Sequence, residues 1–283
     1  MIRISITAAL LFMVNMSYAT PVSINDLYQK NCASCHGANR LGGMGPALLP
    51  ENLKRLRQNK AIKVVSNGRA ATQMPAFVDR LSAKEIQSLV KYVYTPLAKI
   101  PKWEMDDINK SHITHFKANA LSNKPIFKAD MLNLFIVVEL GDHSATLLDG
   151  DKFEPIHRFK TRFALHGGPK YSPDGRYVYF ASRDGWISKF DIYNLKTVAE
   201  IRAGINTRNV AVSGDGKTVL IGNYLPHNLV VLNAETLKPI KVIPVEDKKG
   251  KENPLKTTIR DNAGRVIREV TGRGGIRDEI RRR

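Results

Sequence analysis

The sequence is short of cysteine and of long apolar runs, and each shortage excludes a class of protein. Only two cysteines, Cys32 and Cys35, occur among its 283 residues. No further thiol is available to form a structural disulfide or to complete a zinc site. The apolar run at residues 6–14 is shorter than the roughly 18 residues that a membrane-spanning helix needs, and no later run approaches that length. We therefore expect no membrane span.

The N-terminus has the pattern of a secretory signal. Arg3 provides the positive start, residues 6–14 form the apolar run, and Ser17 and Ala19 are small residues at the cleavage positions. Residues 1–19 are therefore predicted to be a signal peptide, and the mature chain is predicted to begin near Thr20. We expect an exported, periplasmic protein.

Both cysteines lie in one five-residue motif, Cys32-Ala33-Ser34-Cys35-His36. Two thiols three positions apart can add to the two vinyl groups of one haem, and the following imidazole can ligate its iron. A thioredoxin-like redox pair would need a βαβ context and has no use for His36. We predict one covalent haem c attached to Cys32 and Cys35, with His36 as a ligand of its iron.

Residues 20–98 have the helical periodicity of a small all-α domain. Apolar spacing predicts a helix over residues 24–30 and a short helical segment over residues 52–59. A further helix begins after Ser82, where Glu85 completes a capping-box pattern, and Pro96 ends it. A haem at the centre would supply much of the core that so small a domain needs.

The sixth ligand of the haem iron is predicted to be Met74. It precedes Pro75 in a loop before the last helix, whereas Met44 lies only eight residues after His36, too close to reach the opposite haem face easily. Methionine is more often core filler than a ligand, so the assignment depends on the haem already being placed. Ligation by His and Met raises the reduction potential and suits electron transfer.

Residues 22–97 resemble the class I cytochromes c. The resemblance is carried by the haem motif, by Gly45-Pro46 in the loop that follows it, and by Met74-Pro75 before a C-terminal helix. In that family the proline at the position of Pro46 has its carbonyl group on the free nitrogen of the iron-bound histidine. The resemblance implies the same contact between Pro46 and His36.

The chain is strongly basic, with 44 Lys and Arg against 26 Asp and Glu and a formal net charge of +18. Residues 248–283 hold twelve of the basic and five of the acidic residues. The remaining charge is spread without a basic stretch interleaved with aromatics, which argues against a nucleic-acid partner. On an exported redox protein it favours an acidic periplasmic redox partner. Solvated charge with no partner is the alternative.

Beyond a linker at residues 99–127 the periodicity becomes strand-like and repeats. Three similar tripeptides follow one another at intervals of 42 residues: Leu148-Asp149-Gly150, Phe190-Asp191-Ile192 and Leu232-Asn233-Ala234. A period of about 40–45 residues with four strands per unit is typical of β-propeller blades. We predict about three blades over residues 128–247. The fold class is then α + β, with an all-α cytochrome c domain followed by an incomplete propeller.

The repeat carries a second resemblance. Three segments resemble the haem d1 propeller of the c- and d1-haem nitrite reductases and their relatives. They are residues 165–177, Ser182-Arg183-Asp184-Gly185 and Thr207-Arg208-Asn209. The resemblance covers about residues 128–245. It implies that His166 is the proximal ligand of the haem d1 iron, and that Arg183 and Arg208 face the acidic side chains of the macrocycle.

The repeat supports these roles independently. Equivalent blade positions line the same end of a propeller channel, and an anionic tetrapyrrole favours guanidinium groups there. The alternative is a turn histidine and two solvated arginines. Tyr224 and His227 are weaker candidates for the same site. The remaining histidines are expected at the surface: His112, His115, His143 and His157.

The chain departs from this family in its number of blades. The family's propeller has eight, and the repeat fails here from Lys248 onward, so residues 248–283 are expected to be a disordered or weakly helical basic tail. The later blades that carry the distal catalytic histidines have no counterpart, and no catalytic residue is predicted.

Three functions are compatible with this sequence. Residues 163–168 look closer to the haem d1 maturation dehydrogenases, which oxidise a d1 precursor and pass electrons through haem c. The second interpretation is a nitrite reductase that makes nitric oxide from nitrite. The third is a non-enzymatic haem c carrier with a remnant propeller.

Overall fold

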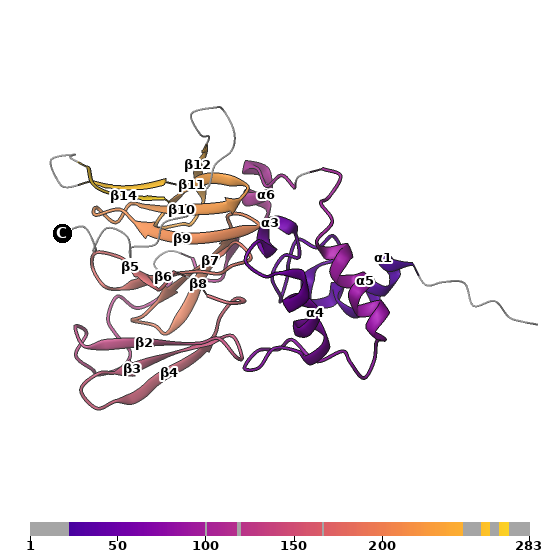
Figure 1. Cartoon of the computed structure of the whole chain (residues 1–283). Helices are drawn as coiled ribbons and strands as arrows, with labels where there is room; N and C mark the ends of the chain where they lie inside the picture. Colours follow the sequence, from indigo (N-terminus) through magenta and orange to yellow (C-terminus); the bar gives the residue numbers. More distant parts are fainter. Residues whose placement is uncertain are drawn as a thin grey trace, which may run out of the picture.

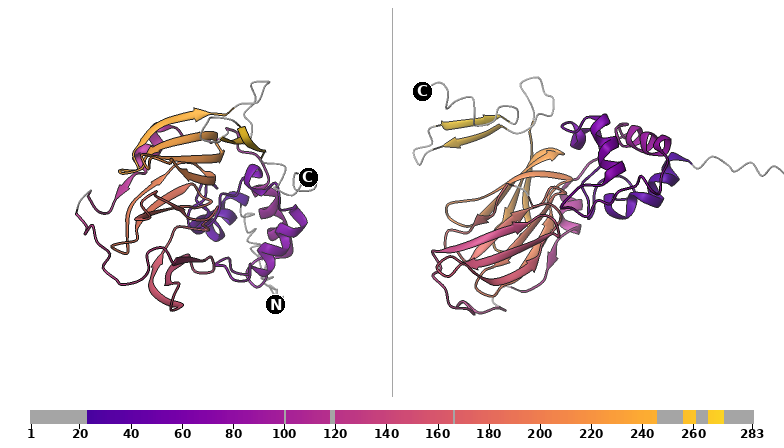
Figure 2. Two further views of the ribbon diagram at one scale, coloured as in Figure 1. Left: turned by 90° about the vertical axis from the view of Figure 1, so that its left-hand side faces the viewer. Right: turned by 60° about the horizontal axis from the view of Figure 1, so that its bottom comes forward.

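A helical domain and a fan of β-sheets make up the computed structural model (Figure 1). The structure describes residues 23–99, 101–117, 120–165, 167–245, 256–260 and 266–271. The predicted signal peptide and the predicted ligand His166 lie outside these residues. The further views in Figure 2 show the same division, with the helices gathered against one end of the sheets.

The first domain is helical, as predicted. Its helices are α1 (Ile24–Asn31), α2 (Ala33–His36), α3 (Pro50–Leu53), α4 (Gln58–Asn67) and α5 (Ala83–Val93). The Ser82 side chain accepts a hydrogen bond from the Glu85 N–H, and the Glu85 carboxylate accepts one from the Ser82 N–H, so the predicted capping box begins α5. The core lies between α1, α4 and α5 and includes Tyr28, Ile86 and Leu89.

The helical segment expected over residues 52–59 is instead two helices, because α3 ends at Leu53 and α4 begins at Gln58. The carbonyl group of Leu56 accepts a hydrogen bond from the Tyr94 hydroxyl and not from a helical N–H. This tertiary contact lies in the segment between α3 and α4.

Three antiparallel sheets follow, one for each predicted blade. The first blade is β2 (Leu134–Glu139), β3 (Ser144–Asp149) and β4 (Glu154–Lys160). The second is β5 (Lys170–Tyr171), β6 (Tyr177–Ala181), β7 (Trp186–Asp191) and β8 (Lys196–Arg202). The third is β9 (Asn206–Val212), β10 (Thr218–Leu225), β11 (His227–Asn233) and β12 (Pro239–Pro244). The predicted three-blade propeller fold is therefore confirmed.

The sequence repeat coincides with the strand register. Asp149 pairs with Leu134, Asp191 pairs with Tyr177, and Asn233 pairs with Thr218. Apolar cores fill the two spaces between successive sheets, and their fully buried members include Leu147, Val178, Ile187, Ile221 and Leu232. Each blade is thus held by its neighbours and not by a core of its own.

Two segments differ from expectation. The linker contains α6 (Met105–Lys110) and β1 (Ile113–Thr114), and β1 adds a fifth strand to the second blade by pairing with β8. In the basic tail, β13 (Lys256–Arg260) and β14 (Val266–Thr271) form an antiparallel hairpin. The expectation of a disordered or weakly helical tail does not hold for these residues. In the described part of the chain, no helix is both long and apolar enough to cross a bilayer.

Candidate functional site

The haem motif begins at the C-terminal end of α1. The Cys32 N–H donates to the carbonyl group of Tyr28 at 2.8 Å, and the hydroxyl of buried Tyr28 donates to the carbonyl group of Gly37 at 2.7 Å. Tyr28 thereby holds both ends of the motif. Cys32 and Cys35 are half-buried and form no disulfide with each other. Burial, with a smaller effect of Cys35, raises the pKa of the Cys32 thiol to about 11.

His36 is 8% exposed, and its Nδ1 atom lies 2.8 Å from the carbonyl oxygen of Pro46. The contact implied by the resemblance to the class I cytochromes c is thus present. Burial lowers the pKa of His36, although the bond to Pro46 opposes this effect. A neutral ring that donates Nδ1–H to Pro46 leaves the lone pair of Nε2 for a metal.

Met74 packs on the same apolar core as Cys32 and Tyr28. Its carbonyl group accepts a hydrogen bond from the Arg69 N–H at 3.1 Å. Gly68, at φ +71°, makes this loop possible, because a Cβ atom there would lie 2.8 Å from the carbonyl oxygen of Met74. Met44, in contrast, is 52% exposed and faces the propeller.

These groups fit a covalent haem c. Cys32 and Met74 border one apolar core in the described domain, and Cys35 and the buried His36 follow Cys32 in α2. Iron ligation by His36 and Met74 stays a prediction. Among the described residues, no three His, Cys, Asp or Glu side chains cluster as ligands of a separate metal ion.

Arg202, at the end of β8, joins the two domains. Its guanidinium donates to the carbonyl group of Leu41 at 2.7 Å and to that of Asp184 at 2.8 Å. It lies over the ring of Trp103, with its Cζ atom 4.8 Å from the ring centroid, and the Trp103 indole N–H donates back to the Arg202 carbonyl group at 2.8 Å. Leu41 follows the haem motif and Asp184 follows Arg183, so one side chain connects both candidate sites.

An apolar contact accompanies this arginine. Ala47 and Leu49 of the first domain pack with Ile205 and Leu225 of the third blade, and all four side chains are nearly inaccessible to solvent. The domains are therefore docked by a buried junction, which limits their relative motion.

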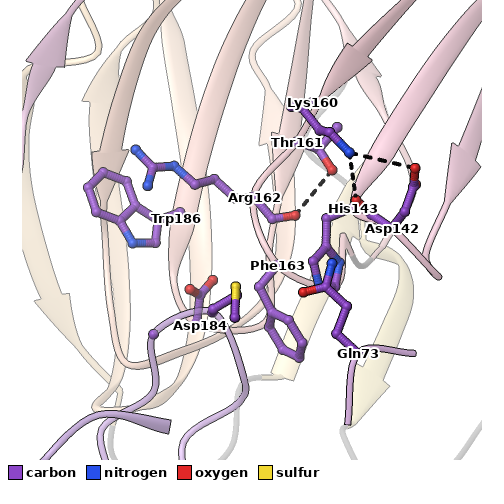
Figure 3. Close-up of a pocket in the computed structure, with 11 residues that line it drawn as sticks. Gln73, Asp142, His143, Lys160, Thr161, Arg162, Phe163, Asp184 and Trp186 are labelled. Atoms are coloured by element: carbon purple, nitrogen blue, oxygen red, sulfur yellow. Dashed lines mark hydrogen bonds and ion pairs between the residues drawn. The ribbon is translucent and has the colours of Figure 1, made fainter. Parts of the chain in front are cut away.

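A cavity of about 440 Å³ lies beside this junction. Figure 3 shows Trp186, Arg162 and Asp184 along one side and His143, Phe163 and Gln73 along another. The Arg162 Cζ atom lies 3.9 Å from the centroid of the Trp186 ring, and its guanidinium donates twice to Glu200 at 2.8 Å. Burial raises the pKa of Asp184, although the Ser182 hydroxyl opposes this effect.

Three loops of the propeller meet at the predicted haem d1 site. The Arg183 N–H donates to the carbonyl group of Ala164 at 3.2 Å, and the Arg183 carbonyl group accepts from the Thr207 N–H at 3.3 Å. At Gly167, with φ +85°, a Cβ atom would lie 3.0 Å from the carbonyl oxygen of Arg208. The segments on both sides of His166 therefore contact the loops of Arg183 and Arg208.

The charge around Arg183 is positive. Desolvation lowers the pKa of Arg183, and the cations Arg208, Arg69 and Arg55 lower it further. Arg69 and Arg55 belong to the first domain, so both domains contribute to this positive region. Arg208 lies over the ring of Tyr224, with its Cζ atom 5.5 Å from the centroid. Such a region favours an anionic ligand.

The sequence pattern did not identify Arg202, Trp103 or His143. Trp103 and Arg202 are 99 residues apart, and no spacing rule connects them. His143 was expected at the surface, but it lines the interdomain cavity with its ring 5.2 Å from that of Phe163. Of the remaining histidines, His115 contacts Glu200 at 3.1 Å and His112 contacts the carbonyl group of Thr236 at 2.7 Å.

Comparisons with known proteins agree with this architecture. Residues 129–268 match the family described as "Cytochrome D1 heme domain", and residues 19–93 match "Cytochrome C oxidase, cbb3-type, subunit III". The chain is 56% identical over 224 residues to the dihydro-heme d1 dehydrogenase of Pseudomonas aeruginosa, an alignment that covers 79% of this chain and 45% of that protein. It is 27% identical over 239 residues to a nitrite reductase of Stutzerimonas stutzeri, covering 77% of this chain and 42% of that protein.

A solved structure is also similar. The dihydro-heme d1 dehydrogenase NirN in complex with DHE gives a TM-score of 0.76 at 54% sequence identity. The match covers 82% of this chain and 50% of that chain. The chain thus spans about half the length of the relatives it matches.

Fold and site define a two-domain haem protein, in which a class I cytochrome c domain that carries covalent haem c precedes a partial haem d1-type propeller. The chain resembles the family of the cytochrome cd1 nitrite reductases and the haem d1 maturation dehydrogenases. Within that family it is a close homologue of the dihydro-heme d1 dehydrogenase.

Proposed function

We propose that this chain is a periplasmic c-type cytochrome that exchanges electrons with a haem d1-type tetrapyrrole in its propeller. Its action would be most like that of the dihydro-heme d1 dehydrogenase. One observation carries the proposal: Arg202 binds Leu41, close to the haem motif, and Asp184, next to Arg183. A cofactor at each site would be held in one docked unit.

Each residue has a defined part in the first site. Cys32 and Cys35 would form the two thioether bonds to the haem, while His36 and Met74 would ligate its iron. Pro46 orients the His36 ring through Nδ1. Haem c bound in this way supplies the transfer of single electrons.

The second site would hold the tetrapyrrole by its carboxylates. Arg183 and Arg208 provide guanidinium groups, and Arg69 and Arg55 add positive charge from the first domain. By resemblance, His166 would ligate the iron of this second cofactor. Dehydrogenation of a dihydro precursor releases two electrons and two protons, so the single-electron site would be used twice per turnover, with an acidic redox protein as final acceptor.

A non-enzymatic carrier is the second candidate. It is favoured by the first site, which needs no second cofactor: His36 is buried and oriented by Pro46, and Met74 packs on the same apolar core as Cys32. A nitrite reductase is the third candidate, and the 27% identity over 239 residues to a nitrite reductase supports it.

Optical spectra of the purified chain separate these functions. We expect haem c bands for the chain alone and additional red-shifted bands after haem d1 is added. Arg183→Ala should weaken binding of haem d1 and leave the haem c bands unchanged, whereas exposed Lys238→Ala should do neither. Haem c bands alone after the addition would contradict both enzymatic functions and leave the carrier.

Export is tested separately. We expect the mature protein in the periplasmic fraction with its N-terminus near Thr20, because residues 1–19 have the signal pattern and covalent haem c is made on the exported side. Recovery in the cytoplasmic fraction, without haem, would contradict this localisation.

A further inference from the structure

Asp184 is a buried carboxyl group next to the predicted haem d1 site. It follows Arg183 in the turn before β7 and is 3% exposed. It also lines the interdomain cavity, where Figure 3 shows it on the same side as Arg162 and Trp186. This carboxyl group therefore lies between the predicted haem d1 site and the space between the domains.

Within the described residues, no ion pair neutralises this carboxylate. Its side chain accepts a hydrogen bond from the Ser182 hydroxyl. The two arginines whose charges act on it are engaged elsewhere, since Arg162 donates twice to Glu200 and Arg202 donates to backbone carbonyl groups. A buried carboxylate without a cationic partner is costly, so burial favours the protonated form of Asp184.

The same kind of turn occurs in the third blade without burial. There the Ser213 hydroxyl donates to the Asp215 carboxylate at 2.6 Å, as the Ser182 hydroxyl does to Asp184. Asp215 is exposed, and the bond from Ser213 lowers its pKa, whereas burial raises the pKa of Asp184. The turn thus forms with an exposed carboxylate as well, and it does not account for the burial of Asp184.

Backbone contacts hold Asp184 at the cavity wall. Its carbonyl group accepts from the Arg202 guanidinium at 2.8 Å, and the carbonyl group of Gly185 accepts from the Ala203 N–H at 2.8 Å. Gly185, at φ +94°, leaves no room for a side chain, because a Cβ atom there would collide with the carbonyl group of Gly204. The turn is packed closely, so the position of the carboxyl group is fixed.

The cavity offers space and polar groups for water. Its volume of about 440 Å³ exceeds the roughly 10–15 Å³ that one water molecule requires. The first domain adds uncharged residues to the wall: Gly43, Met44 and Gln73. The first blade adds ionisable ones: Asp142, His143 and Lys160. The side chains of Lys160 and Asp142 are 74% and 44% exposed, so this end of the cavity reaches solvent.

We propose that Asp184 relays protons from the haem d1 site to water in this cavity. The relay rests on the proposed function, in which two C–H bonds of the dihydro precursor break and one C=C bond forms. The two electrons pass singly through the haem c to the acidic redox protein. Asp184 accepts a proton on its carboxylate and hands it to cavity water, and the proton reaches solvent past Asp142 and Lys160.

Infrared spectroscopy of the full haem c-loaded chain tests this group without a tetrapyrrole. We expect a carboxylic-acid band that persists well above pH 4, where ordinary aspartates lose their proton. The band should disappear in Asp184→Asn and remain in Asp215→Asn. Ser182→Ala should extend it to still higher pH, because the Ser182 hydroxyl opposes the effect of burial.

Unchanged haem c and circular-dichroism spectra show that each variant is folded. A wild type without a carboxylic-acid band above the ordinary range would overturn the proposal. A band that remains in Asp184→Asn would overturn it as well, because another group would then hold the proton.

Turnover of dihydro-haem d1 separates the relay from the proposed function. In Asp184→Asn we expect kcat to fall about 100-fold or more and its pH profile to change, with KM and the red-shifted binding bands unchanged. Asp215→Asn should match the wild type. A wild-type kcat and pH profile in Asp184→Asn would overturn the relay alone. A wild type that does not bind haem d1 would contradict the proposed function and remove the relay with it.

Discussion

Gly45 shows how one absent side chain makes the haem c site possible. A Cβ atom at this position would lie 2.7 Å from Cε1 and 2.9 Å from Nδ1 of His36, well inside van der Waals contact. The neighbouring Pro46 carbonyl group holds the same ring at Nδ1. The loop after the haem motif therefore fixes the imidazole both by contact and by hydrogen bond.

Gly45→Ala should displace the imidazole of His36. The expected result is a changed haem c absorption spectrum and a changed reduction potential, measured by spectroscopy and potentiometric titration. Gly214→Ala is the control, because a Cβ atom there meets nothing within 4 Å. Identical spectra and potentials for both variants would show that the ring can shift without consequence.

Met74→Ala should remove the predicted thioether ligand of the haem c iron. Because ligation by His and Met raises the reduction potential, we expect the potential to fall and the reduced spectrum to change. The control is Met44→Ala, which alters an exposed side chain and should change neither. If Met74→Ala leaves both properties as in the wild type, its assignment as the axial ligand is wrong.

Lys189 makes stability depend on pH. Burial lowers its pKa to about 8, although Glu235 and Asp191 oppose this effect. Since an unfolded lysine keeps its proton to about pH 10.4, the unfolded state binds more protons between about pH 8 and 10, and the stability of the fold rises with pH in that window.

The free energy of unfolding, measured by urea titration at several pH values, checks this sign. Lys189→Met should remove a rise on the order of 1–3 kcal/mol between about pH 8 and 10. Exposed Lys238→Met should retain it. A rise of the same size in Lys189→Met would assign the pH dependence to another group.

At the scale of elements, the end of β8 and the loop before β7 carry the contact between the domains. Arg202 donates from β8 to the carbonyl groups of Leu41 and Asp184, and burial lowers its pKa while Asp184 raises it. The partly buried guanidinium thus provides donors to two backbone carbonyl groups.

Arg202→Ala should loosen the docking without removing the haem. Each lost charge-assisted hydrogen bond costs about 1.5–3 kcal/mol, so we expect faster proteolysis of the linker near Lys102 and an unchanged haem c spectrum. Lys217→Ala is the control, since this lysine is exposed in the third blade and its replacement leaves the linker sequence unchanged. Equal proteolysis of Arg202→Ala and wild type would assign the docking to the apolar contact alone.

At the scale of the whole molecule, the net charge of +18 governs encounters with other proteins. An excess of positive charge attracts an acidic partner over distances comparable to the Debye length, about 10 Å at 0.1 M salt. The charge therefore acts on the rate of association more than on the fold.

Oxidation of the reduced haem c by an acidic redox protein should slow as salt increases. We expect a fall of about tenfold or more between low and high ionic strength in stopped-flow measurements, because screening removes electrostatic steering. Oxidation by an uncharged quinone is the control and should be independent of salt. A salt-independent rate with the acidic protein would favour solvated charge without such a partner.

Local patterns predicted what is local. The capping box at Ser82 was predictable because its two hydrogen bonds join residues three apart, and the blades because a 42-residue period maps onto strand register. The break between α3 and α4 was not predicted; there the Leu56 carbonyl group accepts from the Tyr94 hydroxyl, 38 residues away, a contact that no local pattern encodes. The hairpin β13–β14 was missed because its basic composition suggested disorder.

The sequence by itself determined that two thiols and an imidazole stand at haem c spacing, because one helical turn fixes the positions of Cys32, Cys35 and His36. It also determined the order of a helical domain and three blades, since periodicity is a property of consecutive residues. Only the tertiary structure decided which side chains join the domains. Arg202, Trp103 and Leu41 meet because the blades place the end of β8 against the loop that follows the haem motif, and no pattern along the chain encodes that distance.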